Sequence, residues 1–379
     1  MPMVLNEEQV MLKDAAAEFC RKRSPITEFR KLRDAGGDDG FSRELWAEMV
    51  EMGWAGAIFP EALGGFEFGY QGLGLALEQT GKSLVASPLI STVALSGSVV
   101  QLAGSEAQQQ DIIPAIIAGE RLLSVAVDET HAHNPARISC NAEKSGEGYA
   151  LSGEKRFVLD GHIADQLIVV ARTSGGIEDE NGITLFLVDA NATGVTRSRT
   201  NMVDNRNMAS VALENVQLDA SAVLGEVDGG CAPLNAALDR ARICLAAEML
   251  GSLTQAFEVT IDYLKTRVQF DVAIGTFQAL QHRAAEMFGE VEMARSIVLE
   301  ALTAIDEESD QVPLLASLAK AKLNDIFHLV SNETIQMHGG IGMTDECDVG
   351  FYLKRSRVAT QTLGDSRYHR ARYAALKGY

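Results

Sequence analysis

The sequence lacks the features that mark membrane and secreted proteins. Its 379 residues contain no run of about 18 consecutive apolar residues, the length that a membrane-spanning helix needs. The amino-terminal segment MPMVLNEEQVMLKD carries acidic side chains early and has no apolar core before a small-residue cleavage site, so it does not read as a secretory signal. These absences predict a cytoplasmic protein that does not act at a membrane.

Cysteine is scarce, and basic residues are outnumbered by acidic ones. The formal net charge is −19, with 33 basic and 52 acidic side chains, which argues against nucleic acid or an anionic membrane as the main partner. The five cysteines are odd in number, scattered, and free of any CxxC pair, so we interpret them as reduced structural thiols. They are Cys20, Cys140, Cys231, Cys244 and Cys347.

A metal site is also not indicated. His131 and His133 form an HxH pair, but no cysteine or carboxylate cluster close to them in the sequence completes a ligand set. We therefore predict that the protein binds no metal.

What the chain does have is a globular composition, with 46% hydrophobic and 22% charged residues over a length sufficient for two or three domains. Residues 1–120 carry helical patterns. Asn6 with Gln9 predicts a capping-box start, Ser42 can cap a second helix, and Ser105 with Gln108 opens a third. This part of the chain is predicted to be an amino-terminal helical domain.

Residues 121–228 change to short β-rich runs separated by turn residues. These runs are LLSVAV, GYALSGEKRFV, QLIVVAR, ITLFLVD and MASVAL. They do not alternate with helices as in a dinucleotide-binding βαβ unit, so a nicotinamide dehydrogenase is not indicated. The pattern predicts a mostly antiparallel β-domain.

Residues 229–379 return to the helical period, with long segments near 239–265, 277–306 and 313–337. Three long helices packed side by side are typical of a four-helix-bundle-like domain. The predicted fold class is therefore α+β, with a β-domain between two helical domains.

Two carboxy-terminal segments carry a specific resemblance: RVQFDVAIGTFQALQHRAAEM from Arg267, and QMHGGIGMTDE from Gln336. Together they resemble the acyl-CoA dehydrogenase family. The resemblance implies that family's fold, with a helical domain at 1–120, a β-barrel-like domain at 121–228 and a helical bundle at 229–379. It also implies an FAD cofactor and an acyl-CoA substrate.

The residue types in these segments suit a flavin nucleotide. An FAD pyrophosphate needs a cation and directed donors, which an arginine at a helix end and a glutamine on the next helix can supply. Glycine lets the backbone approach a ligand closely. By resemblance these groups reach the FAD of a neighbouring subunit, so a homotetramer or a heterotetramer with a related chain is implied. The predicted contacts are Arg267, Phe270, Gln278, Gln336, Gly339 and Gly340.

The β-domain departs from the family pattern where the flavin ring is usually contacted. Asp128 and Glu129 stand where the family has Thr-Glu, and the Gly-Ser-Asp that normally follows is missing. The usual aromatic-Ile-Thr reads Phe157, Val158 and Leu159, so the aromatic ring is kept and the hydroxyl is lost. Flavin contacts here should depend more on backbone amides. The predicted contacts are Val127, Asp128, Phe157 and Leu159.

The catalytic base also departs from the pattern. Dehydrogenation removes a proton from the α-carbon as a hydride leaves the β-carbon, so a carboxylate must lie against the substrate. The resemblance places the family's usual glutamate at Gly364, and the alternative position on the first long helix of the third domain at Ala241. Neither residue is a carboxylate.

Glu248 is the replacement that we favour. It lies seven residues after Ala241 and so projects from nearly the same face of the helix about two turns later. Burial in this alanine-rich stretch would disfavour its charged form, as suits a general base. The alternative is a glutamate on the solvated face of an amphipathic helix.

Asp365 is the second candidate, one residue beyond the usual base position, and its alternative role is the N-cap of the helix that begins SRYHRARYA. Arg242 aligns with a family arginine near the catalytic carboxylate and is predicted to tune it. Ser366, which follows Asp365, is included among the cofactor contacts.

The sequence thus supports FAD-dependent α,β-dehydrogenation of an acyl-CoA to the trans-2-enoyl-CoA, with electrons passed to an electron-transferring flavoprotein as the resemblance implies. The absence of the usual base favours a bulky or steroid-type substrate. Such a substrate would belong to fatty acid or steroid side-chain catabolism by β-oxidation. Two alternatives stay open. One is an acyl-CoA oxidase, and the other is a base-lacking structural subunit of a heteromeric dehydrogenase.

Overall fold

The structure is a computed structural model that describes residues 5–379, and these form two compact units. The first, here called the helical unit, comprises the described residues up to Ala35 together with Tyr70–Val85 and Arg242–Tyr379. The second, the sheet unit, comprises Gly36–Gly69 and Ala86–Ala241. The chain passes between the two units more than once, and the last passage, from Ala241 to Arg242, falls inside the long helix α7.

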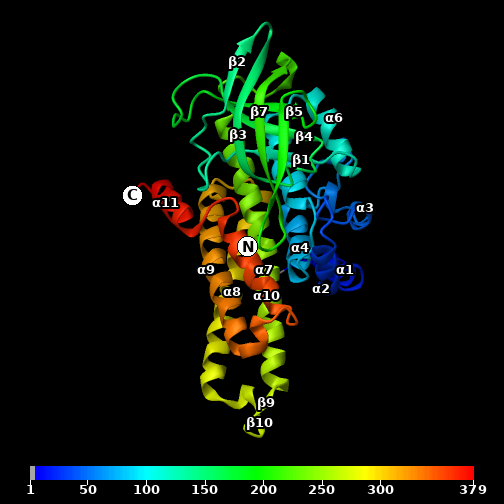
Figure 1. The fold of residues 1–379 in the computed structure, drawn as a ribbon, viewed down its shortest axis with the longest axis vertical. Coiled ribbons are helices and arrows are strands. Elements are labelled where there is room, and N and C mark those ends of the chain that lie inside the picture. Colours follow the sequence, from blue (N-terminus) through cyan, green and yellow to red (C-terminus); the bar gives the residue numbers. More distant parts are fainter. Residues whose placement is uncertain (1–4) are drawn as a thin grey trace. The chain divides into compact units, whose positions relative to one another are not determined.

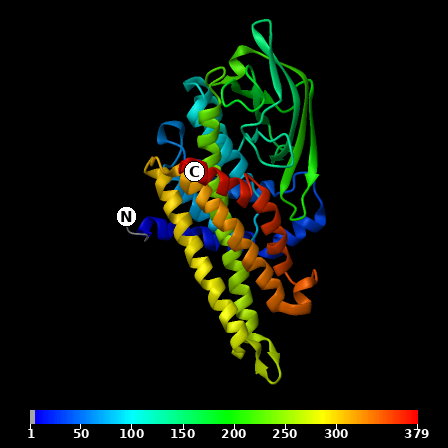
Figure 2. The same cartoon turned by 90° about the vertical axis from the view of Figure 1, so that its left-hand side faces the viewer.

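The helical unit is built mainly from long helices, of which α8 and α9 run antiparallel and adjacent (Figures 1 and 2). Its remaining elements are short. The helices are α1 (Glu7–Arg23), α2 (Ile26–Ala35), α4 (Gly69–Lys82), α7 (Cys231–Thr266), α8 (Gln278–Asp306), α9 (Val312–His338), α10 (Val349–Gln361) and α11 (Ser366–Leu376). The short elements are β9 (Val268–Gln269), β10 (Val272–Ala273), η5 (Ile274–Thr276) and η6 (Gly339–Met343).

Two glycines bring the backbones of α4 and α7 into contact. A Cβ added at Gly81 would lie 2.0 Å from the carbonyl oxygen of Glu248, and one at Gly251 would lie 1.8 Å from that of Glu78. Side chains at these two positions would therefore force the helices apart. At this crossing, the part of α7 that carries Glu248 packs directly against α4. Farther along α7, the Thr260 hydroxyl hydrogen-bonds that of Thr334 on α9 at 3.0 Å.

The sheet unit contains one eight-stranded sheet, in the order β6-β7-β3-β2-β4-β5-β8, with β1 paired to β4. Most pairings are antiparallel, while β1 and β2 each run parallel to β4. The five β-rich runs of the sequence form β1, β3, β4, β5 and β7. The strands are β1 (Leu123–Ala126), β2 (Asn141–Ser145), β3 (Gly148–Leu159), β4 (Gln166–Arg172), β5 (Ile183–Asp189), β6 (Val195–Asn201), β7 (Asn207–Leu218) and β8 (Val223–Leu224).

The sheet unit also carries several short helices. They are α3 (Arg43–Glu51), α5 (Ser98–Ala103), α6 (Glu106–Ile117), η1 (Trp54–Gly56), η2 (Glu61–Leu63), the π-helical η3 (Leu89–Gly97) and η4 (Ala220–Ala222). The predicted caps are present: Ser42 accepts from the backbone of Leu45 at the start of α3, and Ser105 with Gln108 forms a capping box at α6. In the helical unit, Asn6 with Gln9 caps α1 in the same way.

None of the helices in residues 5–379 combines the length and apolar character that crossing a bilayer requires. The same part of the chain holds no group of three or more His, Cys, Asp and Glu side chains placed to bind a metal ion.

Candidate active site

Glu248 lies on α7 inside the helical unit and is 6% exposed. Its helical neighbours include no cation, as the sequence indicates, but the fold brings Arg355 of α10 against it. Nη1 of Arg355 donates to Oε1 of Glu248 at 3.2 Å, and Arg355 is itself buried. A buried carboxylate needs such compensation, because desolvation of an isolated charge is costly. Glu248 is therefore a buried, cation-paired carboxylate.

Arg242, six residues earlier on α7, is fully buried and binds the turn between α10 and α11. Its Nε donates to the carbonyl of Leu363 at 3.2 Å, and its Nη2 donates to the hydroxyl of Tyr368 at 3.2 Å. The guanidinium also lies 5.4 Å from the centre of the Tyr368 ring, within the range of a cation–π contact. Through these contacts, Arg242 helps to hold the conformation of the turn that contains Gly364.

Gly364 adopts a backbone conformation that leaves no room for a side chain. Its φ is +111°, and a Cβ there would lie 2.6 Å from Cδ1 of Tyr368 and 2.7 Å from Nε2 of His369. Its carbonyl accepts from the buried ammonium of Lys320 at 3.1 Å. The two rings thus occupy the space that a carboxylate at this position would need.

Asp365 is the N-cap of α11, where its carboxylate accepts from the backbone N–H of Tyr368 at 2.8 Å. This is the alternative role that the sequence suggested for it. The hydroxyl of Ser366 donates to Asp325 of α9 at 2.9 Å. Both side chains therefore make contacts that stabilise the start of α11.

In the sheet unit, Phe157 lies in a β-bulge of β3, where the register with β7 shifts between Lys155 and Val158. Its φ of +53° is unusual for an aromatic residue and indicates strain. Bulges redirect side chains, and here the Phe157 ring lies 6.0 Å from that of His131. Val127 and Leu159 are both buried, so they can offer a ligand little beyond backbone.

Asp128 uses both of its carboxylate oxygens within its own loop. Oδ2 lies 2.8 Å from Nδ1 of His133, and Oδ1 accepts from the backbone N–H of Asn134 at 3.1 Å. Its carbonyl accepts from the backbone of Arg156 at 2.7 Å. These contacts order the loop that stands in place of the missing Gly-Ser-Asp segment.

Glu129 closes the other end of this loop. It accepts from Lys155 Nζ at 2.7 Å and from the backbone amides of Ser139 and Cys140 at 2.7 and 2.8 Å. Burial alone would raise the pKa of Glu129, but the Lys155 ammonium and these hydrogen bonds hold that pKa below its usual range. Sequence reasoning missed Lys155, because its role depends on a partner on another segment of the sheet unit.

Arg267, Phe270 and Gln278 lie at the exposed connection between α7 and α8, and Phe270 is 85% exposed. This connection therefore exposes a cation, an aromatic ring and an amide. These residue types suit the pyrophosphate and rings of FAD.

Gln336, Gly339 and Gly340 lie at the exposed end of α9. No heavy atom lies within 4 Å of a Cβ built at either glycine, so the backbone there is open to a ligand. Next to them, His338 stacks on Tyr263 with ring centres 4.3 Å apart. Burial lowers the pKa of His338, although a hydrogen bond to the Thr334 carbonyl opposes this. A neutral His338 therefore supports the segment structurally.

Comparison with known proteins matches nearly the whole chain to one family. Three family models match successive segments: "Acyl-CoA dehydrogenase, N-terminal domain" at residues 6–120, "Acyl-CoA dehydrogenase, middle domain" at 126–216, and "Acyl-CoA dehydrogenase, C-terminal domain" at 228–376.

Individual proteins agree with these matches. The chain is 27% identical to the caffeyl-CoA reductase-Etf complex subunit CarC of Acetobacterium woodii, over 96% of this chain and 97% of that protein. It superimposes on butyryl-CoA dehydrogenase from Megasphaera elsdenii with a TM-score of 0.92, at 25% identity over all of both chains. It also superimposes on a variant of the "Tcur3481-Tcur3483 steroid ACAD" with a TM-score of 0.87, at 30% identity over 98% of each chain.

Proposed function

Because the chain belongs to the acyl-CoA dehydrogenase family of flavin-dependent oxidoreductases, we propose that it catalyses the FAD-dependent α,β-dehydrogenation of an acyl-CoA thioester to the trans-2-enoyl-CoA. The observation that carries this proposal is the buried ion pair of Glu248 and Arg355. It provides a carboxylate in a water-poor position although Gly364 stands at the usual base site.

In this proposal Glu248 accepts the α-proton of the substrate. A base must be ionised before the reaction, and a buried carboxylate keeps its charge only where a cation compensates for lost hydration. Arg355 supplies that cation at 3.2 Å. Arg242 acts as a positioning residue, because its bonds to Leu363 and Tyr368 hold the turn around Gly364 in place.

FAD, when bound, accepts the hydride that leaves the β-carbon. In the helical unit, Arg267 and Gln278 would bind the pyrophosphate of a neighbouring subunit's FAD by charge-assisted hydrogen bonds, and Phe270 would lie against a ring. The open backbone at Gly339 and Gly340, together with Gln336, would contact the FAD of a neighbouring subunit in a tetramer. In the sheet unit, the redirected ring of Phe157 and nearby backbone would contact the flavin.

We assign the electrons to an electron-transferring flavoprotein. The similarity to CarC supports this choice, since that protein is named as a subunit of an Etf complex. The alternative enzyme with the same dehydrogenation chemistry is an oxidase, in which dioxygen accepts the electrons. Oxygen consumption that follows turnover without any added acceptor would favour the oxidase.

A second candidate function is a structural subunit without a working base. The filled space at Gly364 favours it, as does the use of both Asp128 oxygens inside their own loop. The chain is also similar to the "Tcur3481-Tcur3483 steroid ACAD", whose name joins two designations. Such a name agrees with an assembly of two different chains. In this case the chain would lend Arg267 and the segment 336–340 to a catalytic partner.

Flavin binding by the purified chain tests the first proposal against the second. Expressed alone, an enzyme should retain FAD, visible as flavin absorbance, and an Arg267→Gln variant should bind FAD about tenfold to a hundredfold more weakly, because one charge-assisted contact is lost. Lys265→Gln removes an exposed charge two residues away and serves as the matched control. A colourless protein that binds FAD only after co-expression with a related chain would support the structural subunit.

A further inference from the structure

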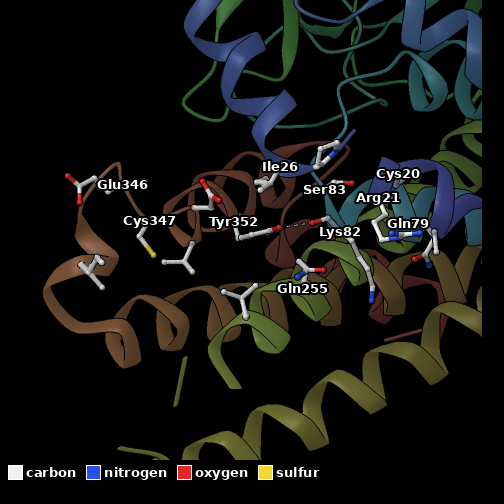
Figure 3. A pocket seen from close by; sticks show the side chains of 16 residues that line it. Cys20, Arg21, Ile26, Gln79, Lys82, Ser83, Gln255, Glu346, Cys347 and Tyr352 are labelled. Atoms are coloured by element: carbon white, nitrogen blue, oxygen red, sulfur yellow. Dashed lines mark hydrogen bonds between the residues drawn. The ribbon is translucent and has the colours of Figure 1, made fainter. Parts of the chain in front are cut away.

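A cavity of about 620 Å³ lies within the helical unit, beside α1, α4, α7 and α10 (Figure 3). Its volume is within the range of small-molecule binding pockets. None of the residues assigned above to flavin binding or proton transfer lines it. The cavity is therefore lined by other residues, although one of them, Ile341, directly follows Gly340 of the proposed FAD-contacting segment.

Two buried polar side chains, one on α4 and one just beyond its end, line this cavity without a hydrogen-bond partner. Gln79 is 3% exposed, and its Nε2 makes no hydrogen bond. The hydroxyl of Ser83, one residue beyond the end of α4, also makes none, although the Cys20 thiol lies beside it. A buried polar group left unsatisfied costs roughly 1–3 kcal/mol, so native proteins seldom keep one without a reason. A ligand oxygen in the cavity would accept from both donors.

Much of the rest of the lining is apolar or already paired. Ile26 and Val259 contribute hydrocarbon, and the ring of Tyr352 adds an aromatic face whose hydroxyl donates to the carbonyl of Lys82 at 2.6 Å (Figure 3). Burial raises the pKa of the Cys20 thiol to about 12, although the Ser83 hydroxyl beside it opposes this, so the thiol is neutral at physiological pH. This part of the lining therefore offers hydrocarbon and hydrogen-bond donors but no charge.

Four charged side chains also line the cavity, two basic (Arg21 and Lys82) and two acidic (Glu346 and Asp348), so together they carry no net charge. Lys82 pairs with Glu258 at 3.2 Å, and Asp348 pairs with Arg30 at 2.6 Å. A bound ion would have to compete with these existing partners. A lining without net charge favours a neutral occupant over a multiply charged one such as a CoA thioester.

We propose that this cavity binds a neutral, largely apolar molecule that carries one carbonyl or hydroxyl oxygen, with that oxygen accepting hydrogen bonds from Gln79 Nε2 and Ser83 Oγ. The site is additional to the dehydrogenase chemistry and does not depend on it.

Nile red, a neutral apolar dye with one carbonyl, is a suitable probe for the full-length purified protein. Its fluorescence should rise on binding. Gln79→Leu keeps the side-chain size but removes the donor, and should weaken dye binding about tenfold. Val259→Trp should abolish binding by filling the cavity. Gln110→Leu, at an exposed position of the sheet unit, should leave binding unchanged.

Thermal unfolding separates loss of a ligand contact from loss of the fold. Gln79→Leu should unfold at the same temperature as wild type or higher, because it removes an unsatisfied amide. The proposal would be overturned if the wild-type protein did not bind the dye, or if Gln79→Leu and Val259→Trp bound it as wild type does.

Two further measurements fix where the dye binds. Saturating butyryl-CoA should not displace it, and Glu248→Gln should bind it normally, so the result is independent of the dehydrogenase proposal. Displacement by butyryl-CoA would place the dye in the acyl site and contradict the assignment. Dye binding to dissociated subunits but not to the assembled protein, judged by size-exclusion chromatography, would show that a second copy fills the cavity and would also contradict it.

Discussion

Glu248 and Arg355 form a buried ion pair, with Oε1 and Nη1 3.2 Å apart, although 107 positions separate them in the sequence. The pair joins α7 to α10 inside the helical unit. It gives Glu248 the surroundings of a functional carboxylate, since the charge is shielded from water yet compensated. It also makes the two residues interdependent, which has measurable consequences.

Breaking one side of this pair should be costly. Arg355→Met leaves the carboxylate buried without a cation and should lower the free energy of unfolding by about 3–5 kcal/mol. Glu248→Met together with Arg355→Met should cost less than the sum of the single changes, because no uncompensated charge remains. Urea unfolding of the four proteins measures this coupling. The exposed pair Glu18 and Lys22 is the control and should show no measurable coupling, whereas additive costs at Glu248 and Arg355 would contradict the buried pair.

Gly364 should tolerate no side chain. Gly364→Ala places a Cβ within 2.7 Å of the Tyr368 and His369 rings at a φ of +111°, and should destabilise the protein by about 1–3 kcal/mol. Gly289→Ala is the matched control, because this glycine lies in α8 with open space around its Cβ and should gain about 0.5–1 kcal/mol. Thermal unfolding compares the two. Equal behaviour of both variants would show that the Gly364 turn is not constrained as described.

Glu129 should make the sheet unit sensitive to acid. Its pKa is lower in the folded protein than the ordinary glutamate value of about 4.3, so its stabilisation is complete above that value and is lost as the pH falls through the folded pKa. Glu129→Gln should therefore destabilise the protein at neutral pH, and the difference from wild type should shrink below about pH 4. Unfolding free energies measured from pH 7 to pH 3 test this. Glu143→Gln, at an exposed position of β2, should show little effect at any pH.

The local features of the fold could be predicted because their causes are local. The capping residues Asn6, Ser42 and Ser105 each act within three positions of the helix that they start. The apolar strands were recognised by their β-branched runs. Strand β6, VTRSRTN, was not, because it is polar and acquires its structure by pairing with β7.

The candidate site could be predicted only in part, for the same reason. Glu248 was found from its helical spacing, but Arg355 could not be assigned to it, since no pattern of 107 residues encodes that contact. The filling of the space at Gly364 by Tyr368 and His369 was equally out of reach. It depends on a positive φ that the sequence allows but does not require.

The proposed function depends most on Glu248, and anaerobic reduction of the bound flavin tests it directly. The purified holoprotein would be mixed with straight, branched and steroid-derived acyl-CoAs while flavin bleaching is followed. We predict that at least one substrate bleaches the wild-type flavin, that Glu248→Gln slows this step by about 10²- to 10⁴-fold, and that the exposed control Glu147→Gln leaves it unchanged. Bleaching of the Glu248→Gln flavin at the wild-type rate, with FAD content unchanged, would contradict the assignment of Glu248 as the base.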